Sequence, residues 1–387
     1  MTSPRPRIAM FSGNYNYVRD GANQALNRLV GYLLRQGAEV RIYSPTTDSP
    51  DFPPTGDLVS VRSISLPFGR GEYRLAVGLT PAIRRDLKAF APNIVHVAAP
   101  DILGHRAITW ARGRNIPVLA SMHTRFETYP RYYGLAFMEP AVEALLRRFY
   151  RRCDAVVAPS ESMAQVMREQ RMSYDIGIWA RGIDTSIFNP GRRDLAWRQA
   201  LGIADDEPVI GFLGRLVMEK GLDVFSDTID ALKARGVRHR VVVIGEGPAR
   251  DWFESRLQNG VFVGFQSGAD LGRAVASMDM LFNPSVTETF GNVTLETMAC
   301  AIPVVAARAT GSESLVLDGV TGRLVKPGSI SGYADALATY CTDASLRLEH
   351  GAAGAKASSA YDWDKVNSAV LDTYQRLLRQ KSGAPRG

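Results

Sequence analysis

Short apolar runs rich in β-branched residues alternate with amphipathic stretches of helical periodicity along nearly the whole chain. This alternation is typical of parallel sheets wound with helices. In the first half, strands are predicted at residues 7–11, 39–43, 94–97, 118–122 and 155–158, and helices at 22–34, 81–90, 140–152 and 161–169. The pattern therefore predicts the α/β class.

The alternation stops near residues 184–193, where Asp, Asn, Pro, Gly and Arg predict a linker, and then begins again. Strands are predicted at 209–213, 240–244, 261–263, 280–283 and 303–306, with helices at 222–234, 248–257 and 270–277. The helices 331–340, 344–358 and 364–378 end the chain. We therefore expect two doubly wound Rossmann-like domains, 1–190 and 191–362, facing a cleft, and a closing helical segment, 363–387.

The composition is that of an ordinary soluble protein. The 387 residues suffice for two cores, 45% are hydrophobic and 22% are charged. No apolar run approaches the roughly 20 residues that span a bilayer, and the N-terminus has no signal-peptide core. Cys153, Cys300 and Cys341 are widely spaced without metal-ligand spacing, so a reduced cytoplasmic setting is expected, without a disulfide framework or zinc site.

The basic excess lies in the first half of the chain. Residues 1–190 contain 24 Lys and Arg against 16 Asp and Glu, a charge of +8, and the remaining residues contain 22 against 23. A one-sided basic surface suggests an anionic partner such as a membrane leaflet, an acidic acceptor or nucleic acid. A solvated surface rich in Arg is the alternative.

Two cations follow the strand predicted at 209–213. Arg215 and Lys220 stand in a Gly-bounded loop that leads into a helix. The amides and dipole of a helix N-terminus favour an anion, and Arg and Lys both bind phosphate. The loop therefore predicts an anion site, with a solvated basic turn as the alternative.

Two carboxylates follow the strand predicted at 280–283. Glu288 is expected at a helix start, beside the amides of Phe290, Gly291 and Asn292, and Glu296 follows two helical turns later among apolar residues. An unpaired carboxylate in such surroundings is costly, which favours a ligand-binding role over a helix cap and a surface charge. Two cations and two carboxylates suit a diphosphate with hydroxyl-rich sugars at either end.

The first domain is expected to supply further site residues. Gly13 and Gly21 lie where backbone amides can approach a phosphate, although turn formation alone also explains them. His123 and Asp101 each follow a predicted strand and face the expected cleft, Asp101 on the acceptor side. Arg181 is expected either to approach phosphates or an acidic sugar, or to brace the linker.

An aromatic and basic segment follows His123. Arg125, Tyr129 and Tyr132 are candidate acceptor-binding residues, and the helical pattern after them carries Arg147, Arg148, Arg151 and Arg152. Aromatic and basic side chains together suit an anionic membrane interface. An ordered acceptor loop beside a solvated helix face is the alternative.

The chain resembles the retaining glycosyltransferases of family 4, which have the GT-B fold. The resemblance rests on Gly214-Arg215…Glu219-Lys220-Gly221, on Glu288-x7-Glu296, on the segments 179–184 and 245–248, and on Asp362-Trp363. It implies that Arg215 and Lys220 bind the donor diphosphate, Glu288 the transferred sugar and Glu296 the nucleotide ribose. It also implies that His123 lies near C6 of that sugar and that the last helix returns to the first domain. The segment from His123 onward resembles the lipid-directed branch, the sulfoquinovosyl- and mannosyl-diacylglycerol transferases.

The predicted function is retaining transfer of a hexose or hexuronic acid from a nucleotide sugar, UDP rather than GDP, to a hydroxyl of a membrane lipid. His123, Arg215, Lys220 and Glu288 are the expected catalytic residues, no metal or cofactor is expected to be required, and the protein is expected on the inner face of the membrane. Alternative acceptors are a soluble molecule or a polysaccharide. A dinucleotide oxidoreductase, a phosphorylase or epimerase, and a non-catalytic membrane- or nucleic-acid-binding module are the rival classes, and nucleic acid is not the expected partner.

Overall fold

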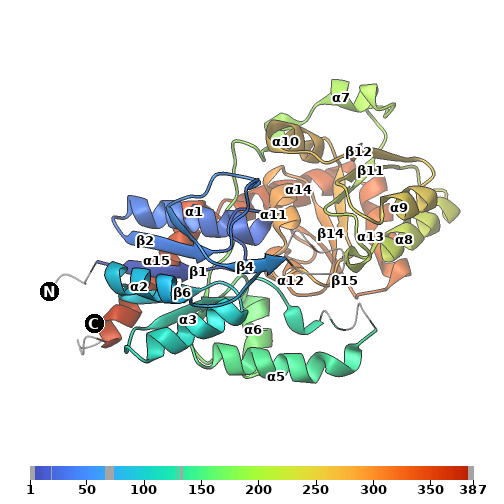
Figure 1. Cartoon of the computed structure of the whole chain (residues 1–387). Coiled ribbons are helices and arrows are strands. Elements are labelled where there is room, and N and C mark those ends of the chain that lie inside the picture. The colour runs from blue at the N-terminus through green and yellow to red at the C-terminus, as the bar shows by residue number, and fades with distance from the viewer. Residues whose placement is uncertain (1–4, 19, 66–73, 129, 131–133, 382–387) are drawn as a thin grey trace. The chain divides into compact units, whose positions relative to one another are not determined.

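The computed structural model describes residues 5–18, 20–65, 74–128, 130 and 134–381. The chain forms two compact units. Unit 1 contains the chain up to Arg181 and again from Trp363 onward, and unit 2 contains Gly182–Asp362. Each unit is built around one parallel sheet, as Figure 1 shows. The predicted α/β class with two Rossmann-like units is confirmed.

The sheet of unit 1 has seven parallel strands in the order β3-β2-β1-β6-β7-β8-β9. Their bounds are β1 Arg7–Phe11, β2 Glu39–Ser44, β3 Asp57–Ser60, β6 Ile94–Val97, β7 Val118–Ser121, β8 Ala155–Ala158 and β9 Ile176–Ile178, and β4 Ser63–Ser65 pairs antiparallel with β5 Arg74–Ala76. The central strands β6, β7 and β8 are buried on both faces, which explains their mainly apolar sequences.

Helices cover both faces of this sheet. They are α1 Gly21–Arg35, α2 Pro81–Phe90, α3 Ile102–Arg112, α5 Glu139–Tyr150, α6 Glu161–Glu169 and α15 Trp363–Lys381, with short 3-10 turns η1 Phe126–Thr128 and η2 Ala136–Met138. The last helix, α15, packs against α1 and β9 through a buried face of Asn367, Val370, Tyr374, Leu377 and Leu378. The end of the chain thus completes the core of unit 1.

Unit 2 has six parallel strands in the order β12-β11-β10-β13-β14-β15. They are β10 Val209–Leu213, β11 Arg240–Ile244, β12 Gly260–Gly264, β13 Met280–Asn283, β14 Val304–Ala307 and β15 Gly322–Val325. Its helices are α7 Leu195–Ala200, α8 Leu222–Ala234, α9 Arg250–Arg256, α10 Gly268–Ala276, α11 Asn292–Ala299, α12 Ser312–Leu315, α13 Ile330–Thr342 and α14 Ala344–Ser358, with 3-10 turns η3 Pro190–Arg192 and η4 Met218–Lys220.

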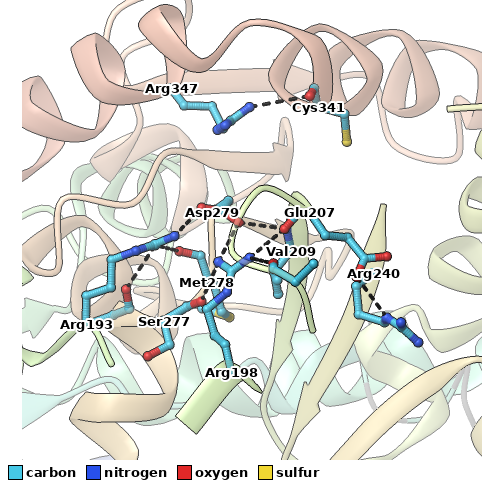
Figure 2. A network of polar contacts seen from close by, with 12 residues as sticks. Arg193, Arg198, Glu207, Val209, Arg240, Ser277, Met278, Asp279, Cys341 and Arg347 are labelled. Carbon is cyan, nitrogen blue, oxygen red and sulfur yellow. Dashed lines mark hydrogen bonds and ion pairs between the residues drawn. The ribbon is translucent and has the colours of Figure 1, made fainter. Parts of the chain in front are cut away.

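An arginine network holds the start of unit 2 to its sheet (Figure 2). Asp279, just before β13, accepts from Arg193 at 2.7 Å, from the fully buried Arg198 at 2.9 Å and from the amide of Val209 at 2.8 Å. Arg198 also donates to the carbonyl of Glu207 at 2.5 Å. Because these bonds lie at the amino ends of β10 and β13, they hold the sheet in place at that end. Other residues lie at its carboxyl edge.

Residues 182–190, which the sequence assigns to the first domain, belong to unit 2. The amide of Ile183 donates to the carbonyl of Tyr361 at 2.8 Å. A Cβ at Gly272 would lie 2.0 Å from the carbonyl oxygen of Ile187, so this segment packs directly on α10. The polar, Pro-containing segment that predicts a linker is therefore a tightly packed part of unit 2.

Candidate functional site

The loop after β10 carries Arg215 and packs on a neighbouring turn. The amide of Leu216 donates to the carbonyl of Glu246 at 2.9 Å. A Cβ at Gly247 would lie 2.4 Å from the carbonyl oxygen of Leu216, so glycine is required at that position. The glycines of the 245–248 segment thus serve loop-to-loop packing, which removes their value as a dinucleotide fingerprint. Arg215 itself is exposed, and within the described residues its guanidinium makes no ion pair.

Lys220 and Glu288 form an ion pair. The Lys220 ammonium lies 2.6 Å from Oε1 of Glu288, and both side chains are only partly exposed, 28% and 17%. Lys220 ends the turn η4, and Gly221 with φ of +76° turns the chain into α8. The loop that carries Lys220 and the loop that carries Glu288 therefore meet at the carboxyl ends of β10 and β13, as the sequence predicts.

A second loop fixes the backbone of Glu288. The Thr310 hydroxyl donates to the carbonyl of Glu288 at 2.9 Å, and a Cβ at Gly311 would lie 2.9 Å from the same oxygen. The α11 helix begins at Asn292 after Gly291, whose φ is +97°. Glu288 thus lies in the loop four residues before the helix, which corrects the expectation that it stands at the helix start.

The amides predicted beside Glu288 lie at the N-terminus of α11. The Phe290 ring is buried and packs edge-on against Tyr361 with 5.8 Å between centroids. Gly291 and Asn292 open the helix, and the carbonyl of Gly291 already accepts from the amide of Leu295. The first-turn amides of α11 have no partner within the helix, which gives this loop the donors that an anion or a hydroxyl needs.

Glu296 lies on α11 and is partly buried. Burial, and secondly the negative charge of Glu288, raise the pKa of its carboxyl to about 8. The group is therefore mostly protonated at neutral pH, and it offers one donor and an acceptor to a neighbouring hydroxyl. A protonated carboxyl of this kind suits a sugar diol, and the burial expected from the sequence agrees with the raised pKa.

Gly13 and Asp101 are neighbours in unit 1. A Cβ at Gly13 would lie 2.7 Å from Oδ2 of Asp101, whose other oxygen accepts from the amide of Gly104 at 2.7 Å and caps α3. Burial raises the pKa of Asp101 to about 6. Because a carboxyl group stands against Gly13, the structure favours the turn interpretation of Gly13 over a phosphate contact.

Gly21 is the first residue of α1, and the N-terminus of that helix is already capped. The carboxylate of Asp20 accepts from the amide of Asn23 at 2.8 Å. Burial raises the pKa of Asp20, while the amides of Asn23 and Ala22 and the charge of Arg181 oppose the shift. The capping carboxyl occupies the position that a phosphate would need, so Gly21 is also explained by the turn.

His123 is held at both ring nitrogens. Its Nδ1 lies 2.9 Å from an Arg181 nitrogen, and its Nε2 lies 2.9 Å from the Ser121 hydroxyl. The Trp179 ring packs edge-on against the imidazole with 5.5 Å between centroids. Burial, then the positive charge of Arg181, lower the pKa of His123 well below its usual value. The imidazole is therefore neutral and fixed in orientation.

Arg181 braces the structure. Its guanidinium is buried and also donates to the carbonyls of Trp179 and Ala180 at 3.2 and 3.3 Å. Burial lowers its pKa to about 10, while the nearby charge of Asp20 opposes the shift, so the group stays protonated at neutral pH. Of the two roles the sequence allows for Arg181, bracing is the one its contacts support.

The three acceptor candidates after His123 have different outcomes. Arg125 donates to the buried carboxylate of Glu127 at 2.7 Å, an internal ion pair that occupies its guanidinium. Tyr129 and Tyr132 lie outside the described residues.

The arginines around the end of α5 are mostly engaged within the protein. Arg147 pairs with Glu143, Arg151 donates to the carbonyl of Arg171 at 2.9 Å, and Arg152 donates to Thr109 at 2.6 Å. The helix ends at Tyr150, so Arg151 and Arg152 lie beyond it rather than within one helix. Arg148 is exposed.

A strip of exposed apolar residues lies on η2 and α5, beside these arginines. Phe137 is 77% exposed and Leu145 is 63% exposed. Phe137, Ala141 and Leu145 recur every four residues, the spacing of one helix face, and Arg148 follows one turn later. We name Phe137, Met138, Leu145 and Arg148 the α5 strip.

Several residues that shape the site are absent from the sequence-based prediction. Thr310 and Gly311 position Glu288, Ser121 makes a hydrogen bond with His123, and His96 makes one with Ser121. The histidine in the apolar strand Ile94–Val97 was a usable signal, because a buried imidazole requires partners.

In the part of the chain that the structure describes, no three His, Cys, Asp or Glu side chains gather as metal ligands would. None of the described helices combines the length and the apolarity that a membrane crossing requires.

Comparison with known proteins identifies two family matches. Residues 19–187 match the family described as Glycosyltransferase Family 4, and residues 207–343 match the one described as Glycosyl transferases group 1. Sulfoquinovosyl transferase SQD2 of Arabidopsis thaliana is 28% identical over 380 residues, which cover 96% of this chain and 73% of that protein. A GDP-mannose-dependent alpha-mannosyltransferase of Mycolicibacterium smegmatis is 29% identical over 390 residues, covering 97% of this chain and 99% of that protein.

Solved structures share the fold. Sucrose-phosphate synthase from Thermosynechococcus elongatus superposes with a TM-score of 0.79 at 18% identity, covering 96% of this chain and 99% of that chain. Anabaena HepE in complex with UDP and glucose superposes with a TM-score of 0.71 at 20% identity, covering 95% and 99%.

Proposed function

We propose a function for this chain as a member of the GT-B glycosyltransferases that join a Family 4 N-terminal part to a group 1 C-terminal part. It transfers a hexose or hexuronic acid from a UDP-sugar to a hydroxyl of a membrane lipid, with retention at the anomeric carbon. The observation that carries the proposal is the pairing of Lys220 with Glu288 beside Arg215 and Glu296 at one edge of the unit 2 sheet.

The polar groups at this edge match the parts of a nucleotide sugar. Arg215 and Lys220 supply fixed positive charge for a diphosphate, and the first-turn amides of α11 add donors. Glu288 accepts from hydroxyls of the transferred sugar. Glu296, protonated at neutral pH because its pKa is about 8, both donates to and accepts from the ribose diol.

The proposed chemistry depends on stabilising the leaving group. As the glycosidic bond breaks, negative charge grows on the departing diphosphate, and Arg215 and Lys220 stabilise that charge. The departing phosphate then takes the proton of the acceptor hydroxyl on the same face of the sugar, which gives retention. This route uses no metal ion, and we propose that none is required.

The donor base is the part of the proposal with a named rival. Similar proteins bear the name GDP-mannose-dependent alpha-mannosyltransferase, and solved structures of the same fold contain UDP or UDP-glucose. We favour a UDP-sugar, the donor class that those solved structures contain. GDP-mannose is the second candidate.

The lipid acceptor is supported by the surface of unit 1. The α5 strip presents Phe137 and Leu145 to solvent with Arg148 beside them, and apolar side chains next to a cation suit an anionic bilayer surface. Residues 1–190 carry an excess of positive charge, which also favours an anionic surface. We propose that the protein binds membranes peripherally through this strip.

The test is release of nucleotide from a panel of UDP- and GDP-sugars, with and without lipid acceptors, by wild type and by Glu288→Ala. We expect one UDP-sugar to be consumed by wild type and spared by the variant. Glu254→Ala on α9, which removes an exposed carboxylate bonded to Arg250, is the control and should retain activity. Consumption of GDP-mannose alone would replace the UDP proposal, and no turnover or binding of any nucleotide sugar would overturn the function.

A further inference from the structure

A continuous row of hydrogen bonds runs from the last helix of the chain to His123. The Tyr374 hydroxyl on α15 lies 2.5 Å from Nδ1 of His96, and Nε2 of His96 lies 2.9 Å from the Ser121 hydroxyl. The Ser121 hydroxyl in turn lies 2.9 Å from Nε2 of His123. Tyr374, His96 and Ser121 are all buried, so none of these groups exchanges its partner with bulk water.

The charge of Arg181 sets the direction of this row. A guanidinium can only donate, so Nδ1 of His123 accepts and its single proton is on Nε2, pointing to Ser121. A buried hydroxyl that accepts from His123 satisfies its own proton by donating to Nε2 of His96. In the arrangement that satisfies the Ser121 proton in this way, His96 carries its own proton on Nδ1 and donates to the Tyr374 hydroxyl.

Other groups around the row keep both imidazoles neutral. Burial lowers the pKa of His96 to about 3 and that of His123 well below its usual value, with Arg181 and His96 adding to the shift at His123. Trp179 packs edge-on against both rings, with centroids 6.3 Å from His96 and 5.5 Å from His123. Each ring therefore carries a single proton, on one of its two nitrogens.

Helix α15 is held in place independently of Tyr374. Asn367, two turns earlier on the same face, accepts from the Trp179 indole at 3.0 Å. Arg376 makes two bonds with Asp175, at 2.6 and 2.8 Å. Removal of one hydroxyl therefore leaves the helix docked, so the effect of Tyr374 on the histidines can be separated from the effect of α15 on folding.

We propose that Tyr374 is a positioning residue for His123, acting through His96 and Ser121. The C-terminal helix thereby fixes the tautomer and the orientation of a side chain that it does not touch. The catalytic part of this inference rests on the proposed function and on the position near the transferred sugar that the family resemblance implies for His123. The structural part, the tautomers of the two histidines, does not.

The experiment compares Tyr374→Phe with Tyr340→Phe. Tyr340 is an equally buried tyrosine whose hydroxyl lies 2.7 Å from Nδ1 of a buried histidine, His350, in unit 2, so it is a matched control without a link to His123. Nitrogen-15 NMR of the histidine side chains reports the tautomers. In wild type we expect the proton on Nε2 of His123 and on Nδ1 of His96.

In Tyr374→Phe, Nδ1 of His96 loses its acceptor, so we expect the His96 proton to move to Nε2 and the His123 resonances to shift. In Tyr340→Phe, His96 and His123 should both keep their wild-type spectra. With the donor identified by the panel above, kcat should fall about tenfold in Tyr374→Phe at nearly unchanged donor KM, the size expected of misorientation. The control should keep its kcat.

The outcomes separate the two proposals. Unchanged His123 resonances in Tyr374→Phe, or equal kcat values in the two variants, would overturn the positioning role. If wild type turns over no nucleotide sugar, the proposed function fails while the NMR comparison still decides the hydrogen-bond row. Ser121→Ala, which cuts the row at its centre, is the second variant should Tyr374→Phe not fold, and the same shift at His123 is expected from it.

Discussion

Lys220 and Glu288 come from loops after different strands, and their charged groups lie 2.6 Å apart. The two groups neutralise each other, so neither is left as an unpaired charge in a partly buried position. A bound diphosphate offers Lys220 a second anionic partner, and a sugar hydroxyl offers Glu288 a donor. In the proposed function, the same two side chains hold the two loops together and bind adjacent parts of one ligand, its diphosphate and its transferred sugar.

Replacement of Lys220 tests the cation role. Lys220→Ala should lower turnover by two or more orders of magnitude, because one fixed positive charge is lost where the leaving diphosphate gains negative charge. Steady-state kinetics with circular dichroism checks the result. Lys233→Ala on α8 removes an exposed ion pair with Asp230 and should leave turnover unchanged. Near-wild-type turnover in Lys220→Ala would remove the diphosphate role.

Replacement of Gly247 tests whether the glycine turn holds the Arg215 loop. In Gly247→Ala the added Cβ would lie 2.4 Å from the carbonyl oxygen of Leu216, so the loop must shift. We expect a loss of about 1–3 kcal/mol in the free energy of unfolding and weaker donor binding. Gly113→Ala is the control, since its Cβ would approach nothing closer than 3.6 Å. Equal thermal stability and equal donor affinity in the two variants would contradict the packing argument.

The carboxyl of Glu296 gives stability a pH dependence. Its pKa rises from an ordinary 4.5 to about 8 in the folded protein, so the folded state holds a proton that the unfolded state releases between these values. The stabilisation of the folded state by this proton is fully present below pH 4.5 and is lost as pH rises to about 8. Asp101, whose pKa rises to about 6, acts with the same sign at lower pH.

Glu296→Gln isolates this term. The amide cannot ionise, so we expect the variant to gain thermal stability relative to wild type as pH rises from 5 to 9, most steeply midway between pH 4.5 and about pH 8. Melting temperatures across that range provide the measurement. A difference between the two proteins that is constant with pH would show that Glu296 is ionised when folded.

Vesicle binding tests the α5 strip. The double variant Phe137→Ser and Leu145→Ser should bind phosphatidylglycerol vesicles at least about tenfold more weakly, because two apolar side chains lose their transfer free energy. Leu348→Ser on α14 removes a similarly exposed leucine, 74% exposed, from unit 2 and should bind as wild type does. Equal cosedimentation of both variants would sink the membrane proposal.

Chelation tests the metal-independent route. Turnover should be unchanged after treatment with EDTA and restoration of ionic strength, because the proposed leaving-group stabilisation comes from Arg215 and Lys220. Turnover that is lost with EDTA and restored by Mg²⁺ or Mn²⁺ would require a metal ion in the reaction. Lys220→Ala assayed with added Mg²⁺ is the companion measurement, since a metal ion that carried the charge would rescue it.

Elements that depend on local sequence patterns were the predictable part. The strands Ile94–Val97 and Val209–Leu213 and the helix Leu222–Ala234 have the bounds that their periodicity predicts. The edge strands β3 and β9 were missed, because they are short and only partly buried, so neither shows a clear apolar run. In the candidate site, Arg215, Lys220, Glu288 and Glu296 were identifiable because loops after parallel strands share one edge of a sheet.

Contacts between distant segments were not predictable. Asp101 lies against Gly13, so a side chain assigned to the acceptor has a protein neighbour instead. A spacing rule identifies the end of a strand, but it does not tell which neighbouring side chain fills the space beside it. The same limit applies to Tyr374, which is 278 residues away in sequence from His96.

The return of α15 to unit 1 determines the order in which the chain can acquire its structure during synthesis. Asn367 and Tyr374, the buried partners of Trp179 and His96, follow unit 2 in the chain and leave the ribosome after it, whereas unit 2 is one uninterrupted segment. Unit 2 can therefore fold while unit 1 still lacks Val370, Tyr374 and Leu377 of its core, the reverse of the usual N-terminal-first order. A chain cut before Trp363 would therefore have a complete second unit and a first unit that exposes an apolar face, so the completion of unit 1 depends on α15.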